Sequence, residues 1–189
     1  MLPPAFQARV ALDPWGTALQ AARTGSEPGT LVYAPLEQRC HAAIILAPGR
    51  AVTDAVVLRI GGMAVRDALT ALLPPGSAVV ASPRCITVNR AEIAPLRMAR
   101  SPSKDQADGA PDWVVLGFDV AVALHDPAPG LHPWRTDLAE EGAPRSSCEV
   151  LETVCRHLLA WCDLWESEGD AAVEAAWRRD RVDTRQGQP

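Results

Sequence analysis

The sequence predicts an α+β fold with a mixed, mostly antiparallel sheet flanked by helices. Short apolar runs that are typical of strands gather in the middle of the chain, and longer stretches with helical spacing flank them. The chain has 189 residues, of which 48% are hydrophobic and 22% charged, as in a globular domain. We therefore expect a single domain over residues 1–180 and a disordered tail over residues 181–189.

The expected strands are apolar runs bounded by glycine, proline or polar residues. They cover residues 30–33, 42–46, 77–81, 86–89, 92–98 and 113–122. Pro95 interrupts the fifth run, which predicts an edge strand or a bulge there, because proline cannot donate a ladder hydrogen bond. Residues 1–14 are expected to form an irregular arm punctuated by prolines.

The expected helices are marked by their ends. They cover residues 15–24, 52–73, 147–167 and 171–179. Thr53 can cap the second helix, and Ser146 with Glu149 forms a capping box at the start of the third, which Gly169 ends. Gly61 and Gly62 fall inside the second helix, where glycine costs about 1 kcal/mol relative to alanine, so a close packing contact is expected there.

Charge and composition exclude several function classes. The net charge of −5 argues against nucleic acid or an anionic membrane as partner. We find no apolar run of 18 residues and no secretory signal, and the five cysteines are an odd number, so we expect free thiols and a cytoplasmic location. Lys104 is the only lysine among 18 basic residues; this arginine bias, with much alanine and proline, is typical of a GC-rich bacterial genome.

Four segments, taken in order, resemble the catalytic domain of biotin and lipoate protein ligases. Residues 27–33 (EPGTLVY) are similar to the strand before the family's glycine- and arginine-rich loop. Residues 82–89 (SPRCITVN) resemble its Lys-Trp-Pro-Asn-Asp-Ile…Val-Asn segment, and residues 113–120 (WVVLGFDV) resemble its Gly-Ile-Asn-Val strand. Residues 136–142 (TDLAEEG) and the helical residues after them resemble its C-terminal part.

The resemblance implies a fold, a chemistry and partners. The fold would be the class II synthetase-like domain of these ligases. The family uses ATP and Mg²⁺ to make an acyl-adenylate of biotin or lipoate and passes the acyl group to a lysine of a carrier protein. An active member would therefore bind these cofactors and an acyl-carrier domain. The resemblance also leaves a homodimer open as the oligomeric state.

The sequence departs from the family at the positions that carry this chemistry. Alignment on Pro83 puts Ala81 at the catalytic lysine, and residues 34–41, where the glycine- and arginine-rich loop belongs, contain no glycine. The asparagine of the Gly-Ile-Asn-Val strand is Asp119, and a carboxylate repels phosphate unless it binds Mg²⁺. The positions that remain as expected remnants of the pocket are Gln38, Arg39, Ser82, Pro83, Asn89, Gly117 and Asp119.

Three residues are candidates for altered chemistry. Arg84 or Arg97 could supply the positive charge of the lost lysine, although a guanidinium lacks the compact reach of an ammonium group. Cys85 could act as an acyltransferase nucleophile if its pKa were depressed, and an inert thiol is the simpler interpretation. Three hypotheses follow: a degenerate ligase-like protein that binds a protein partner, an active ligase or acyltransferase, and a non-reactive module that binds a small acyl ligand.

The cysteines and tryptophans near the C-terminus favour packing over metal binding. Cys148, Cys155 and Cys162 are seven residues apart on one helical stripe, which separates their sulfur atoms by about 10 Å, too far for one zinc ion. Trp161 and Trp165 lie on a stripe expected to pack in the core, or at an interface if they prove exposed. We therefore predict no metal site.

Overall fold

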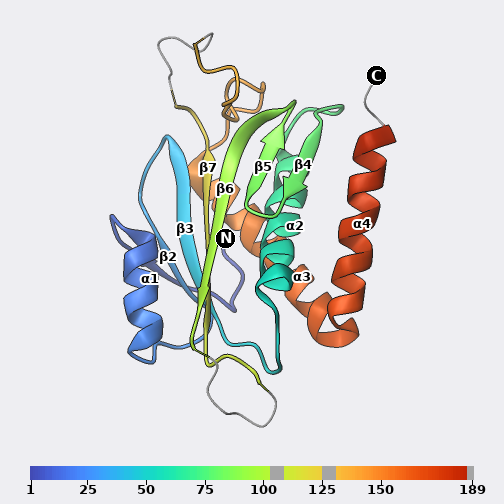
Figure 1. Cartoon of the computed structure of the whole chain (residues 1–189). Helices are drawn as coiled ribbons and strands as arrows, with labels where there is room; N and C mark the ends of the chain where they lie inside the picture. The colour runs from blue at the N-terminus through green and yellow to red at the C-terminus, as the bar shows by residue number, and fades with distance from the viewer. Residues whose placement is uncertain (103–108, 125–130, 187–189) are drawn as a thin grey trace.

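The fold is a seven-stranded sheet with helices on both sides (Figure 1). The computed structural model describes residues 1–102, 109–124 and 131–186, with side chains up to residue 180. The strands are β1 (Gln7–Val10), β2 (Thr30–Tyr33), β3 (Arg39–Leu46), β4 (Val79–Ser82), β5 (Cys85–Val88), β6 (Ala91–Arg100) and β7 (Val114–Ala121). The helices are α1 (Pro14–Arg23), α2 (Asp54–Leu72), α3 (Ser147–Glu168) and α4 (Asp170–Gln186).

The strand order is β1-β2-β3-β7-β6-β5-β4. The β1–β2 pair is parallel and the other pairs are antiparallel, so the predicted mixed, mostly antiparallel sheet is confirmed. The long strands β3 and β7 pair over their full length in the centre. Within the described residues, no helix is long and apolar enough to cross a membrane.

The two faces of the sheet have different covers. The helix face carries Ala42, Ile44, Leu116 and Phe118, which form one buried core with α2, α3 and α4. We call the other side the open face, because among the described helices α1 alone packs against it. Under α1, a smaller apolar cluster forms from Ala18, Ala22, Val32, Ala43, Ile45 and Val115.

The predicted ends of the helices are confirmed. The Thr53 hydroxyl accepts a hydrogen bond from the Val56 N–H at 3.3 Å, and Ser146 with Glu149 forms the complete capping box. Gly169, with φ of 84°, ends α3. A Cβ atom at Gly61 would lie 2.7 Å from Leu116 Cδ1, so this glycine lets α2 approach β7 closely, as expected.

Pro95 does not lie on an edge strand, since β6 lies between β7 and β5. A bulge is present nearby but not at Pro95: the register of β5 and β6 shifts between Ile86 and Thr87, which leaves Ile93 of β6 without an opposite residue. Pairing with β5 ends at Pro95, and pairing with β7 begins at Leu96. The proline therefore occupies the residue where β6 changes partner, which accommodates its missing N–H.

Two expectations about the chain ends were wrong. Residues 7–10 form β1 and not an irregular arm; all four are exposed and they pair with β2. The last helix, α4, extends over Asp170–Gln186 and therefore continues through most of the stretch expected to be a tail. Buried Val173 and Trp177, in the predicted part of α4, join the helix-face core.

Candidate functional site

The open face presents a polar cluster in the centre of the sheet. His41 of β3 lies opposite Asp119 of β7, and Arg97 of β6 lies opposite Gly117. Because side chains alternate along a strand, Arg39 and His41 point to the same side, away from buried Cys40 and Ala42. We define the open-face cluster as Arg39, His41, Arg97, Asp119 and Trp15.

Each arginine of the cluster already has a partner. Arg39 Nε donates to Asp119 Oδ1 at 2.8 Å, and the two side chains are only partly exposed. Arg97 Nη2 lies 2.9 Å from His41 Nε2. The Arg97 guanidinium also stacks 4.5 Å above the centre of the Trp15 ring, a cation–π contact.

Gly117 makes the stacking geometry possible. A Cβ atom at this position would lie 2.8 Å from Trp15 Cε3 and 3.2 Å from Arg97 Cγ. Glycine therefore leaves the space in which the indole ring and the arginine stem meet over β7. The structure places Gly117 in the cluster as a packing residue that supports Trp15 and Arg97.

The pKa of His41 is lowered from its ordinary value of 6.5. Partial burial is the main cause; the charges of Arg97 and Arg39 act in the same direction, while Asp119 and Asp13 oppose it. A neutral imidazole can accept a hydrogen bond at Nε2, so near neutral pH Arg97 donates a hydrogen bond to His41. The ring then carries its own proton on Nδ1.

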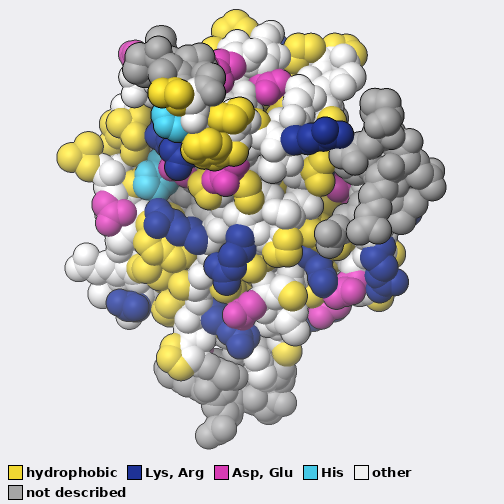
Figure 2. All heavy atoms as spheres, turned by 45° about the horizontal axis from the view of Figure 1, so that its top comes forward, with side chains coloured by type: hydrophobic (Ala, Val, Ile, Leu, Met, Phe, Trp, Pro, Cys, Tyr) yellow, Lys and Arg dark blue, Asp and Glu magenta, His cyan; other side chains and the backbone are white. Residues whose placement is uncertain are grey.

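A small polar depression adjoins the cluster. Its volume is about 140 Å³, and its polar walls come from Arg39, Glu92, Arg135 and Thr136. The side chain of Thr136 donates to Glu141 at 2.8 Å. Figure 2 shows basic, acidic and histidine side chains mixed over one face of the molecule. The surface here therefore carries both positive and negative charges.

The segment aligned with the family's lysine motif forms the β4–β5 hairpin. Ser82 and Cys85 pair across it, and the Ser82 hydroxyl donates to the Cys85 carbonyl at 2.7 Å. Pro83 and Arg84 are the exposed turn residues. Ala81 points to the helix face and is buried there, 1% exposed. Its side chain therefore faces away from the open-face cluster.

Cys85 is half-buried beside Glu92. Burial, followed by the Glu92 carboxylate, raises the pKa of the Cys85 thiol to about 12. The thiol is thus protonated at neutral pH, and its Sγ contacts the Ile86 carbonyl at 3.3 Å. This is the opposite of the depressed pKa that activates a nucleophilic cysteine.

The remaining sequence candidates, Gln38 and Asn89, lie in the connections next to the strands and contribute local hydrogen bonds there. The Gln38 carbonyl accepts from the Val122 N–H at 2.9 Å, while its side chain is exposed. Asn89, with φ of 49°, and Arg90, with φ of 76°, turn the chain between β5 and β6. Asn89 Nδ2 donates to Glu141 at 2.7 Å, so its contacts lie at this turn.

Sequence reasoning brought Arg39, Arg97, Gly117 and Asp119 into one site but missed His41 and Trp15. The two-residue spacing of Arg39 and His41 in a strand was the available signal, because it puts both on one face. Trp15 carried no such signal, since its contact with Arg97 joins a helix to a strand far along the chain.

The model of the biotin/lipoate A/B protein ligase family matches residues 2–179. The chain belongs to this family. A search of curated proteins found no match. Among solved structures, a biotin protein ligase-like protein of unknown function from Silicibacter sp. TM1040 is 31% identical and superposes with a TM-score of 0.81, covering 95% of this chain and 80% of its own.

More distant ligases share the fold. The biotin protein ligase of Aquifex aeolicus is 13% identical, with a TM-score of 0.72 over 92% of this chain and 76% of that one. The ligase of Leishmania major, solved with biotinyl-5-AMP, is 15% identical, with a TM-score of 0.67 over 94% and 81%. The ligase-like fold expected from the sequence is therefore confirmed.

Proposed function

We propose that this ligase-like protein is catalytically degenerate and acts by binding, as an accessory or assembly protein. The observation that carries the proposal is the open-face cluster. Arg39 is neutralised by Asp119, and Arg97 is held by His41 and Trp15. The carboxylic acid and the ATP that react to form an acyl-adenylate bring carboxylate and phosphate charge, which needs unpaired cationic donors.

Two further observations support this proposal. The connection between β2 and β3, where the family's glycine- and arginine-rich loop belongs, is residues 34–38 and contains no glycine. Ala81, which aligns with the family's lysine, is buried against the helices. Neither feature offers a cationic group to an adenylate on the open face.

A second candidate is an active member that attaches biotin, lipoate or another acyl group to a carrier protein with ATP and Mg²⁺. One observation favours it: the Arg97 side chain remains exposed on the open face, where it could give up its hydrogen bond to His41 and bind an anion. The ligase of Leishmania major binds biotinyl-5-AMP on the same fold. Cys85 does not favour an acyltransferase, because its raised pKa keeps the thiol protonated.

A pyrophosphate-release assay separates the two candidates. The purified protein is incubated with ATP·Mg²⁺ and biotin, lipoate or octanoate, with and without an apo carrier domain. The degenerate candidate predicts no pyrophosphate above the blank, together with calorimetric binding of a protein partner. Pyrophosphate release that depends on the acid, is lost in Arg97→Ala and persists in Arg23→Ala would overturn the proposal. Arg23 is the matched control because it is exposed at the end of α1.

Cysteine alkylation tests the acyltransferase variant separately. At pH near neutrality, iodoacetamide should modify exposed Cys148 well before Cys85, because only the thiolate reacts and the pKa of Cys85 is about 12. Peptide mass spectrometry over a time course gives the order. Preferential modification of Cys85 would instead support its role as a nucleophile.

A further inference from the structure

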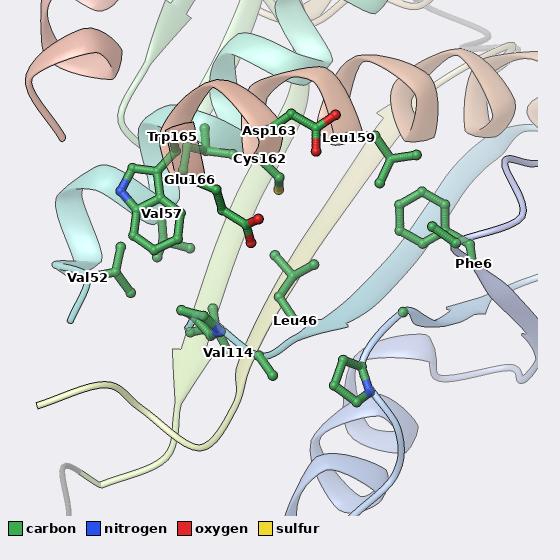
Figure 3. Close-up of a pocket in the computed structure, with 16 residues that line it drawn as sticks. Phe6, Leu46, Val52, Val57, Val114, Leu159, Cys162, Asp163, Trp165 and Glu166 are labelled. Atoms are coloured by element: carbon green, nitrogen blue, oxygen red, sulfur yellow. The ribbon is translucent and has the colours of Figure 1, made fainter. Parts of the chain in front are cut away.

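A cavity of about 290 Å³ lies on the helix face, at the end of the sheet where α2 begins (Figure 3). It is therefore on the side of the sheet opposite the open-face cluster. The last turns of α3 cover it, and its apolar walls include Phe6, Leu46, Val57, Val114, Leu159 and Trp165. Its volume is close to that of small-molecule sites and far above the space of a single water molecule.

The charged groups at this cavity have one sign. Among the described residues that line it, Asp163 and Glu166 carry charge, and no arginine, lysine or histidine is present. Neither carboxylate forms a salt bridge with another described residue. In Figure 3 the Glu166 carboxylate points into the space above Leu46, and Asp163 projects from the preceding turn of α3.

The aromatic wall is held in place from outside. Trp165 Nε1 donates to Asp170 Oδ1 at 2.7 Å, and the Arg50 guanidinium stacks 4.5 Å from the centre of the ring. Arg50 also donates to the Trp165 carbonyl and does not line the cavity. The indole is thus fixed before any ligand binds, which lowers the entropy cost of binding.

Cys162 lines the same cavity. Burial first, and then the Glu166 and Asp163 carboxylates, raise the pKa of its thiol to about 12. A charge that opposes thiolate formation also opposes any other anion in this space. Biotin, lipoate and octanoate are carboxylates, so the cavity disfavours all three.

We propose that this cavity binds a small amphipathic cation, a primary ammonium on a short apolar tail. The tail would fill the space between Phe6, Leu159 and Trp165, and the ammonium would meet the Glu166 and Asp163 carboxylates. The size of the cavity matches a free small molecule, which we take as the occupant. The inference does not depend on the proposed function, because it concerns the other face of the sheet.

Three probes that share a six-carbon chain and differ in their polar group test the assignment: hexylammonium, 1-hexanol and hexanoate. Titrations followed by NMR of the tryptophan indole N–H signals give the affinity and the place. We expect hexylammonium to bind about fivefold more tightly than hexanol, hexanoate to bind most weakly, and the Trp165 signal, assigned with Trp165→Phe, to move. Equal or tighter binding of hexanoate, or no binding of hexylammonium, would overturn the proposal.

Matched variants locate the charge. Glu166→Gln should lower the affinity for hexylammonium part of the way to that of hexanol, because Asp163 remains, whereas Glu168→Gln, on the same helix but outside the cavity, should leave it unchanged. A shift of the Trp15 signal in place of Trp165 would assign binding to the open face and contradict the proposal. Nα-acetyllysine amide serves as the competing occupant: if it binds as tightly as hexylammonium, a lysine side chain of a protein, and not a small molecule, fits the site.

Discussion

The two faces of the central strands β3 and β7 carry opposite chemistry on alternate residues. On the helix face, Ile44, Leu116 and Phe118 are almost completely buried in one continuous core. On the open face, His41 and Asp119 stand opposite each other and remain partly exposed. The same backbone thus stabilises the fold on one side and presents a polar site on the other.

This difference predicts which property a substitution on each face should change. Changes on the helix face should be measured in stability, because burial of apolar surface is the dominant favourable term in folding. Changes on the open face should alter ion pairs and titration while leaving the fold largely intact. Four predictions test the division, in order of decreasing effect.

The largest effect is expected from Phe118→Ala. The Phe118 side chain is 2% exposed in the helix-face core, and its truncation leaves a cavity. We expect a loss of about 3–5 kcal/mol in the free energy of unfolding, measured by urea denaturation. Arg97→Ala, on the open face of the neighbouring strand, is the matched control. A comparable loss in both variants would refute the division between the faces.

Gly117→Ala should cost about 1–3 kcal/mol, because the added Cβ would meet Trp15 Cε3 at 2.8 Å and force the indole to move. Gly62→Ala is the control, since its Cβ would find Trp177 at an ordinary 3.4 Å and alanine favours a helix. Chemical denaturation of both variants, with the Trp15 indole signal as a local probe, measures the contrast. A stability of Gly117→Ala equal to that of the wild type would show that the stacking has room to relax.

Asp119→Asn should cost about 0.5–1 kcal/mol, because Arg39 loses a partly exposed ionic partner. The same change should lower the pKa of His41 further, since the Asp119 charge raises it. Titration of the imidazole by NMR measures the second effect. A rise of this pKa in the variant would contradict the arrangement of charges described for the open-face cluster.

The smallest effect is a pH dependence that belongs to His41. Its folded-state pKa is below 6.5, so the unfolded chain takes up its proton first as the pH falls. The contribution of His41 to stability is therefore complete above about pH 6.5 and is lost as the pH falls through the folded-state pKa. His41→Gln should make the urea midpoint less sensitive to pH over this window than it is in the wild type, and an unchanged sensitivity would contradict the assignment to His41.

Most of the fold could be predicted from the sequence. Apolar periodicity and end signals located the four helices and six of the seven strands, because these signals act over a few residues. Strand β1 could not be found this way. Its four residues are all exposed and lack apolar alternation, and only pairing with β2 makes them a strand.

The candidate site was predictable only in part. The resemblance pointed to Arg39, Gly117 and Asp119, yet their pairing depends on the β3–β7 register, which joins residues 80 positions apart. Cys85 illustrates the limit further: the sequence left a depressed pKa and a nucleophilic role open, whereas burial and Glu92 raise the pKa of the thiol. Electrostatics follow spatial neighbours more than sequence neighbours.

The sequence by itself determined the α+β class, the caps of α2 and α3, and the departures from the family's lysine and glycine-rich loop, because each can be recognised in a few adjacent residues. Tertiary structure alone decided which charges neutralise one another on the open face. It also brought Asp163 and Glu166 of α3 to an apolar cavity beside β3 and β7. The reason is physical: local pattern sets backbone conformation, whereas burial and charge pairing arise from contacts that long-range packing creates.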